Sequence, residues 1–266
     1  MSTLNQITPQ NLMRLIGTPD CPVLIDVCDD DDFGDDPNLI PTSFHHPSKS
    51  LETLVPSLQG KRVVVICKKG LKLSSGGAAL LRSHGITAEN IEGGKVAWRD
   101  AGLPFVPAGK LPANKLWVTR HRPKIDRIAC PWLLRRFVDP GTRILYVPPS
   151  DVMLVAERYN AIPFDVPEAQ YSHREELCTF DVLLQEFGLQ SKALDAVAEV
   201  VRAADTNKHD ASPQAAGLLA ISVGLSRMYK DDTRQLDAGM AVYDALYRWA
   251  RDGQEESHDS SGAVRS

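Results

Sequence analysis

Cys67 is the residue of this 266-residue sequence whose surroundings most favour chemistry. It directly follows the apolar run VVVI, so its side chain is predicted to emerge at the carboxyl end of a buried strand, where open α/β sheets bind ligands. Lys68, Lys69 and Lys72 surround it with positive charge, and the turn is predicted to lead into a helix whose first amides face the loop. Both effects favour a thiolate over a thiol. A thiolate at this point could attack sulfur or bind an oxyanion.

A second group of reactive side chains lies in the segment 117–143, which is dense in Arg and Lys and has few acids. Guanidinium groups bind tetrahedral or planar oxyanions through paired N–H donors, better than single ammonium groups do. The segment therefore predicts an oxyanion site. Its candidate residues are Arg120, Arg122, Lys124 and Arg127.

A metal ion is an alternative ligand for the second half of the chain. The segments SHREELCTFD and AADT contain ligand types that could meet around an ion if the loop and the following helices fold together. The candidate ligands are His173, Glu176, Cys178 and Asp205. The competing prediction has Thr179 or Ser172 cap the helix FDVLLQEFG, places Asp181 in its first turn and turns Cys178 toward the core. Their spacing matches no established metal motif, so the sequence leaves both alternatives open.

Alternating strands and helices are predicted over residues 1–106, which is the pattern of a parallel sheet with helices packed on it. PVLIDV (22–27) and KRVVVICKKG (61–70) contain short β-branched runs typical of buried central strands. SSGGAALLRSHG (74–85) predicts a helix closed by a glycine. These elements would hold the Cys67 loop between a strand and a helix.

A cluster of helix and strand breakers divides the chain. FVPAGKLPAN (105–114) contains two further prolines and a glycine, and the composition changes after it. The second half is predicted to be a mainly helical α+β domain, with strands at LWVTR (116–120) and RILYV (143–147). The predicted organisation is a first domain 1–108, a linker 109–115, a second domain 116–252 and a disordered tail 253–266.

Composition and charge narrow the classes of protein. The formal net charge of −4, from 30 Lys+Arg against 34 Asp+Glu, gives no general attraction to nucleic acid or to an anionic membrane. No apolar run approaches the ~20 residues of a membrane-spanning helix, and the first residues lack a signal-peptide pattern. The five cysteines form no CxxC pair. We therefore expect a cytoplasmic protein without a membrane or nucleic-acid partner.

Three features of the first half occur together in one order: LIDV near the start, the C-x-x-G loop after a strand, and IEGGKVAWRDAGLPFV near the end. In these the chain resembles a rhodanese domain over roughly residues 5–107. The resemblance implies an α/β domain with a parallel sheet and a sulfurtransferase whose Cys67 carries a persulfide. It implies no required cofactor, and a small-molecule sulfur donor and acceptor, or a thiol, as partners. By the same resemblance Asp26 braces the fold, and the active-site loop consists of Lys68, Lys69, Gly70, Leu71 and Lys72.

The sequence departs from the rhodanese pattern at several points. Cys28 stands where an Arg usually follows LIDV, and Leu73 stands where the common loop has Ser, while Lys72 keeps the basic position. The usual GHIPGA is NLIPTS here. The alternative to a working sulfurtransferase is thus a rhodanese fold whose thiol only packs or binds an anion.

The second half carries the string TRHRPKIDRIACPWLLRRFVD, followed by YVPP, IPFDVP, SHREELCTFD and DAGMAVYDALYRWAR. In these motifs it resembles the C-terminal domain of the ChrB family, which implies a link to chromate resistance and sensing. Family members that regulate transcription carry a different N-terminal region, so the resemblance implies no DNA binding. Chromate is a tetrahedral dianion shaped like sulfate, and one Arg-rich pocket could hold either.

Together these observations predict a sulfurtransferase that forms a persulfide on Cys67 and is fused to a chromate-resistance or oxyanion-binding domain. One alternative is a non-enzymatic sensor that binds chromate or a sulfur oxyanion. Another is a metal-dependent enzyme in the second domain, with a metal ion as its cofactor.

Overall fold

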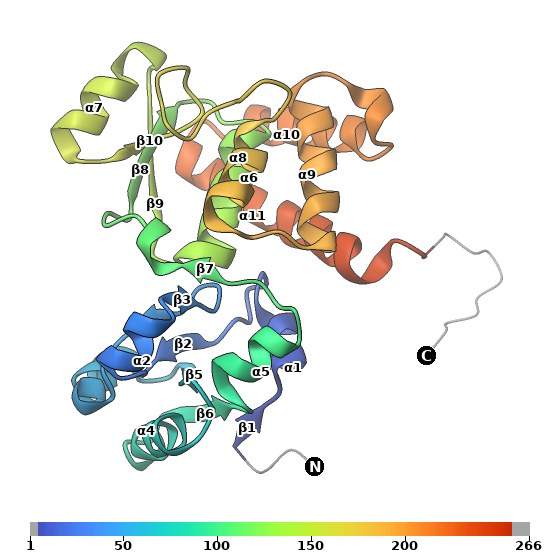
Figure 1. The fold of residues 1–266 in the computed structure, drawn as a ribbon. Coiled ribbons are helices and arrows are strands. Elements are labelled where there is room, and N and C mark those ends of the chain that lie inside the picture. Colours follow the sequence, from blue (N-terminus) through green and yellow to red (C-terminus); the bar gives the residue numbers. More distant parts are fainter. Residues whose placement is uncertain (1–4, 257–266) are drawn as a thin grey trace.

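The structure is a computed structural model that describes residues 5–256. An N-terminal domain and a C-terminal domain lie against each other, with the segment around β7 passing between them (Figure 1). Among the described helices, none combines the length and the apolar character needed to cross a membrane.

A five-stranded parallel sheet forms the centre of the N-terminal domain, in the order β1-β6-β5-β2-β4. Its strands are β1 (Gln6–Ile7), β2 (Val23–Asp26), β4 (Phe44–His45), β5 (Arg62–Ile66) and β6 (Thr87–Ile91). A small antiparallel pair joins β3 (Asn38–Leu39) to β7 (Val106–Pro107). The helices are α1 (Pro9–Leu15), α2 (Asp30–Asp35), the 3-10 helix η1 (Ser48–Leu54), α3 (Val55–Leu58), α4 (Lys72–Ser83) and α5 (Gly94–Asp100).

Both faces of this sheet are covered, which explains the unbroken apolar run of β5. Val64 and Ile66 belong to the core on the side of α1 and α5, together with Trp98. Val63 and Val65 belong to a separate core on the side of α4 and η1. The period of two along the strand therefore places alternate side chains in two cores.

A smaller parallel sheet in the order β10-β8-β9 supports the C-terminal domain. Trp117 of β8 joins the large helical core, whereas Val118 faces α7. The strands are β8 (Leu116–Arg120), β9 (Arg143–Val147) and β10 (Ile162–Pro163). The helices are α6 (Asp126–Leu133), α7 (Val152–Tyr159), α8 (Thr179–Phe187), α9 (Lys192–Asp205), α10 (Ala215–Met228) and α11 (Asp232–Arg248). The remaining described elements are short helices. Three are 3-10 helices, η2 (Ala108–Lys110), η4 (Pro149–Asp151) and η5 (His209–Ala211), and two are π-helices, η3 (Leu134–Val138) and η6 (Trp249–Gly253).

The two domains share one continuous apolar core, which runs from α1 into the helices of the C-terminal domain. Gly17 permits this close approach, because a Cβ there would lie 2.4 Å from Phe137 and 2.6 Å from Tyr247. The N–H of Thr42 donates to the carbonyl of Phe137 at 3.1 Å, and Arg251 donates to the carbonyl of Arg14 at 2.8 Å. The domains are therefore packed together and are not merely tethered.

The predicted architecture is confirmed: an α/β N-terminal domain with a parallel sheet and a mainly helical C-terminal region. The strands expected at 22–27, 61–70, 116–120 and 143–147 correspond to β2, β5, β8 and β9. The predicted tail begins at residue 253, the last residue of η6, and its residues 257–266 lie outside the described residues.

Candidate functional site

Cys67 follows the last residue of β5 and lies at the carboxyl edge of the sheet, as the sequence predicts. Its side chain is almost buried, at 5% exposure, and its thiol donates a hydrogen bond to Ser74 Oγ at 3.1 Å. Ser74 belongs to the first turn of α4, so the thiol lies against the amino end of that helix. The helix dipole there favours an anion.

The carbonyl groups of the Cys67 loop are held by other elements. The N–H groups of Lys95 and Val96, at the start of α5, donate to the carbonyls of Cys67 and Lys68 at 3.0 Å each. Asn90 Nδ2 donates to the carbonyl of Gly70 at 3.2 Å. The carbonyls of Cys67, Lys68 and Gly70 are thus engaged by β6 and by the start of α5.

The backbone N–H groups of residues 68–71 form a contrasting set. Within residues 5–256 they donate to no protein acceptor. Gly70 has φ +69°, and a Cβ there would lie 2.6 Å from the N–H nitrogen of Gly94. A loop of free amides beside a helix amino end is the arrangement that cradles oxyanions.

The positive charge predicted around Cys67 is partly neutralised. Lys68 Nζ lies 2.6 Å from Asp32 Oδ1 and 3.6 Å from Asp35 Oδ2, both on α2. The hydrogen bond to Asp32 raises the pKa of Lys68. Lys69 and Lys72 are exposed, so they carry the free positive charge of the predicted active-site loop, and Leu71 projects beside them.

Asp26 lies under the loop, at the end of β2, and is buried. One oxygen accepts from the N–H of Cys28 at 2.9 Å, and the other lies 3.4 Å from Lys95 Nζ. Lys95 is also buried and donates to the carbonyl of Asp36 at 2.8 Å. Because the backbone N–H of Lys95 donates to the Cys67 carbonyl, this ion pair connects β2 to the Cys67 loop.

Cys28 belongs to the same apolar core as Cys67. Burial raises the pKa of the Cys28 thiol, and the carboxylate of Asp26 acts in the same direction. Cys28 therefore stays a protonated, buried thiol.

A second polar cluster lies in the C-terminal domain, around His173. Its Nε2 lies 3.2 Å from Asp205 Oδ2, 3.4 Å from Asp126 Oδ2 and 3.5 Å from Asp165 Oδ1. Asp126 begins α6 and Asp205 ends α9, while His173 lies in the loop before α8. The imidazole is 41% exposed, whereas Asp126 is fully enclosed by protein.

Thr179, the first residue of α8, fixes two of these carboxylates. Its N–H donates to Asp126 Oδ2 at 2.7 Å and its hydroxyl donates to Asp165 Oδ1 at 3.0 Å. Ile125 has φ +38°, which is rare for a β-branched residue, and its carbonyl accepts from the hydroxyl of Tyr243 at 3.0 Å. The start of α6 is thus held in one conformation, with Asp126 facing His173.

Electrostatics in this cluster follow from burial and from like charges. Burial raises the pKa of Asp126, and the carboxylates of Asp205 and Asp165 add to the effect. Hydrogen bonds to Asp126, Asp165 and Asp205 raise the pKa of His173 far above its ordinary value. The cluster therefore combines three carboxylates with the imidazole of His173, and the guanidinium groups of Arg120 and Arg127 lie against Asp165.

The structure brings together two of the four metal ligands predicted from sequence, His173 and Asp205. Glu176 is exposed and pairs with Lys208 instead. Cys178 is buried at the amino end of α8, where its N–H donates to Asp181 at 3.0 Å, so the competing prediction is right about the first-turn Asp181 and the buried thiol. Its choice of cap is wrong, because Cys178 is the N-cap and Thr179 is the first residue of the helix. Burial raises the pKa of the Cys178 thiol, so it stays protonated. Asp126 and Asp165 were missed by the sequence reasoning.

The four predicted oxyanion residues are not brought to one point. The guanidinium of Arg122 donates to the carbonyls of Tyr229 and Ser226, which closes the end of α10. Arg120 pairs with Asp165 at 2.8 Å, and Arg127 lies 3.5 Å from the same carboxylate. Lys124 is exposed.

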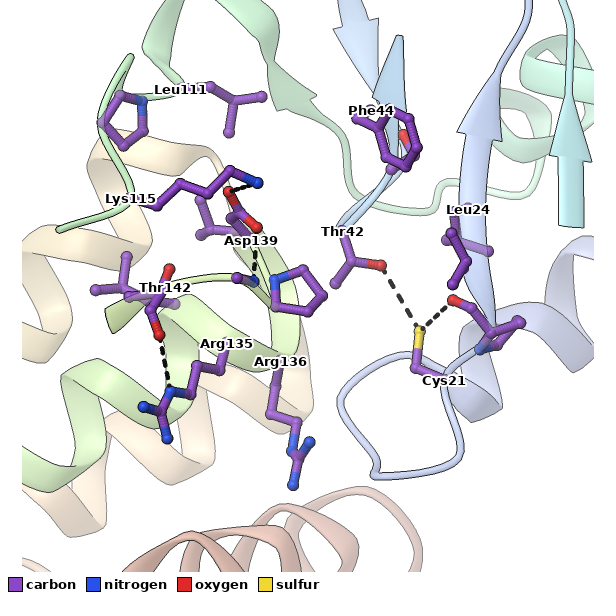
Figure 2. Close-up of a pocket in the computed structure, with 18 of the residues that line it drawn as sticks. Cys21, Leu24, Thr42, Phe44, Leu111, Lys115, Arg135, Arg136, Asp139 and Thr142 are labelled. Atoms are coloured by element: carbon purple, nitrogen blue, oxygen red, sulfur yellow. Dashed lines mark hydrogen bonds and ion pairs between the residues drawn. The ribbon is translucent and has the colours of Figure 1, made fainter. Parts of the chain in front are cut away.

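A cavity of about 610 Å³ lies between the two domains (Figure 2). In it, Cys21 Sγ lies 3.6 Å from the hydroxyl of Thr42, and Arg136 also lines the cavity. Neither Cys67 nor His173 lines this cavity. The guanidinium of Arg136 is already bound to Asp244 at 2.8 Å, so the cavity offers no free cation at that point.

Comparisons with known proteins agree with this division. The family model for the rhodanese-like domain matches residues 8–101, and the model for the ChrB C-terminal domain matches residues 117–250. Protein ChrB of Cupriavidus metallidurans is 30% identical over 171 residues, which are 58% of this chain and 51% of that protein. The chain thus spans about half the length of this curated relative.

Two solved structures each cover a little more than a third of this chain. A rhodanese-like domain protein from Staphylococcus aureus is 26% identical and covers 36% of this chain and 91% of its own, with a TM-score of 0.32. A thiosulfate sulfurtransferase from Pseudomonas aeruginosa is 24% identical over 38% of this chain and 19% of its own, with a TM-score of 0.32.

The fold and the two family matches define a two-domain protein with a rhodanese-like N-terminal domain. The family model for the ChrB C-terminal domain covers just over half of the chain. The chain therefore belongs to the family that this domain defines.

Proposed function

We propose that the N-terminal domain is a sulfurtransferase that carries sulfane sulfur as a persulfide on Cys67. The observation that supports this most is the loop itself: the Cys67 thiol lies at the amino end of α4, below N–H groups that have no protein acceptor within residues 5–256. Free amides at this position would stabilise a negatively charged donor, the attacking thiolate and the persulfide. The reaction needs no cofactor.

The chemical steps balance without a redox co-reactant. With thiosulfate as donor, the Cys67 thiolate attacks the outer sulfur, the S–S bond of thiosulfate breaks, and sulfite leaves with the electron pair. A new S–S bond on Cys67 holds the transferred sulfur. An acceptor such as cyanide or a thiolate then attacks that sulfur, and Cys67 leaves as a thiolate.

The experiment is thiosulfate-to-cyanide transfer by the purified chain beside Cys67→Ser and Cys28→Ser. We expect thiocyanate release by the unchanged protein and by Cys28→Ser, and none by Cys67→Ser. Mass spectrometry after thiosulfate alone should show one added sulfur atom on the peptide of Cys67. If Cys67→Ser keeps the full rate, the assignment of the nucleophile is wrong. If neither protein binds sulfur, the domain is the anion-binding alternative instead.

A second candidate activity concerns an oxyanion such as chromate or sulfate, bound by the C-terminal domain. The observation that favours it is Arg120 Nε, a buried donor with no partner among the described residues. We expect Arg120→Gln to weaken chromate binding in calorimetry by about tenfold, the usual loss of one charge-assisted hydrogen bond. Arg143→Gln, an exposed residue of β9, is the control. Equal chromate-binding isotherms for Arg120→Gln and Arg143→Gln would show that Arg120 does not bind the oxyanion.

A further inference from the structure

We infer that Asp126, His173 and Asp205 form a binding site for one divalent transition-metal ion in the C-terminal domain. The three residues each offer one ligand atom, and these atoms lie within 4.8 Å of one another. They come from three separate elements: the start of α6, the loop before α8 and the end of α9. This site is independent of sulfur transfer at Cys67.

The two separations from His173 to the carboxylates of Asp126 and Asp205 are those of a coordination shell. Two donors bound to one ion at about 2.1 Å lie about 3.0 to 3.4 Å apart in octahedral or tetrahedral geometry. The Nε2 of His173 lies 3.2 Å from the nearest oxygen of Asp205 and 3.4 Å from that of Asp126. A single imidazole N–H cannot satisfy both oxygens well, whereas an ion between the three atoms would.

An independent observation is the state of the Asp126 side chain. It is 1% exposed and directed at His173, yet its Oδ1 has no hydrogen-bond partner among the described residues. A buried carboxylate oxygen without a partner is costly, and a metal ion would satisfy it by drawing the whole carboxylate into coordination. The Oδ2 is oriented by the N–H of Thr179 at 2.7 Å, the kind of outer contact that fixes metal ligands.

The donor set selects the class of ion. Two carboxylates and one imidazole suit Mn²⁺, Fe²⁺ or Zn²⁺, because Mg²⁺ and Ca²⁺ are bound mainly by oxygen. The exposed face of His173 leaves room for water or a small ligand on the ion. Asp165, whose oxygens are held by Thr179 and Arg120, would remain an outer partner.

The test uses Mn²⁺ as the probe, because the five cysteines could bind Zn²⁺ through sulfur and Mn²⁺ avoids thiols. Electron paramagnetic resonance of the full chain titrated with Mn²⁺ counts bound ions directly. We expect one bound ion per chain, and at least tenfold weaker binding in His173→Gln and in Asp205→Asn. Glu176→Gln is the matched control, since this exposed acid of the same loop pairs with Lys208.

Circular dichroism melting separates loss of the site from loss of the fold. Asp205→Asn keeps the shape of the side chain at a partly exposed position, so it should fold as the unchanged protein does. Stoichiometric binding that survives in a folded Asp205→Asn and in His173→Gln would overturn the inference. So would the absence of Mn²⁺ binding in the unchanged protein, which would leave His173 as the centre of an ion-pair cluster. A loss in Glu176→Gln equal to that in His173→Gln would overturn the proposed set of ligands.

Discussion

The backbone N–H of Lys95 donates to the carbonyl of Cys67 at 3.0 Å, while the Lys95 ammonium lies buried against Asp26. One residue thus holds the Cys67 loop through its main chain and the central strand β2 through its side chain. The charge buried in the fold and the position of the thiol are therefore linked by a single lysine.

Removal of the Lys95 charge should weaken the N-terminal domain. In Lys95→Met, the carboxylates of Asp26 and Asp36 lose their buried cation, and we expect a loss of about 3 to 5 kcal/mol. Chemical denaturation followed by circular dichroism measures the change. Lys69→Met, an exposed lysine of the same loop, should change stability by less than about 0.5 kcal/mol. Equal stability of the two variants would contradict the role of the buried pair.

Asp32 should limit the affinity of the site for anionic donors, because its carboxylate neutralises Lys68. We expect Asp32→Asn to lower the KM for thiosulfate about twofold to fivefold at low salt, with a smaller effect at high salt. Steady-state kinetics at two ionic strengths measure this. Asp30→Asn on the same helix has no ion pair with Lys68 among the described residues and serves as the control. A KM that falls equally in Asp32→Asn and Asp30→Asn would show that the net charge of α2 sets the affinity and that the Lys68–Asp32 ion pair does not.

The close contact between the Cys67 loop and α5 should tolerate no side chain at Gly94. A Cβ there would lie 2.2 Å from the carbonyl of Cys67 and 2.4 Å from the N–H nitrogen of Gly70. We expect Gly94→Ala to displace the loop and reduce sulfur transfer roughly a hundredfold. Gly76→Ala, on the open side of α4, should keep activity and raise stability by about 0.5 to 1 kcal/mol. Full activity in a folded Gly94→Ala would show that the loop geometry is not needed.

Acid should destabilise the contact around Glu186 of α8. The hydrogen bond from Arg174 lowers the pKa of Glu186, and Lys110 acts in the same direction. The unfolded chain then binds a proton more readily, so this stabilisation is complete above about pH 4.5 and is lost as the pH falls through the lower folded pKa. Melting temperatures of Glu186→Gln and the unchanged protein should converge as the pH falls from 6 to about 3. Glu157 is an exposed residue of α7, and Glu157→Gln is the control. Its melting temperature should change with pH in parallel with that of the unchanged protein.

The sequence carried the Cys67 prediction because the relevant signals are local. A strand, a cysteine and a glycine turn follow one another within a few residues, and their order along the chain determines where the side chain emerges. The sequence could not show the ion pair between Lys68 and Asp32 of α2. This contact forms because β2, which precedes the acidic residues 29–36, lies beside β5, which precedes the Cys67 loop.

The C-terminal cluster shows the opposite case. His173 and Asp205 were predicted as ligands, but Glu176 and Cys178 were grouped with them only because they are near in sequence. Asp126 lies 3.4 Å from His173, although it belongs to a basic segment that the sequence assigned to oxyanions. Asp126 is one of two acids in that segment, and its position at the start of a helix is the signal that could have identified it.

By itself the sequence determined the two-domain pattern, the central strands and the position of Cys67 at the end of a strand, because hydrophobic periodicity and turn chemistry act over short distances. Only the tertiary structure decided which charges face each other. Packing of α6, α8 and α9 directs Asp126, His173 and Asp205 to one point, and it turns Arg122 into the end of α10. Such meetings depend on how whole helices cross, and residue spacing along the chain does not encode them directly.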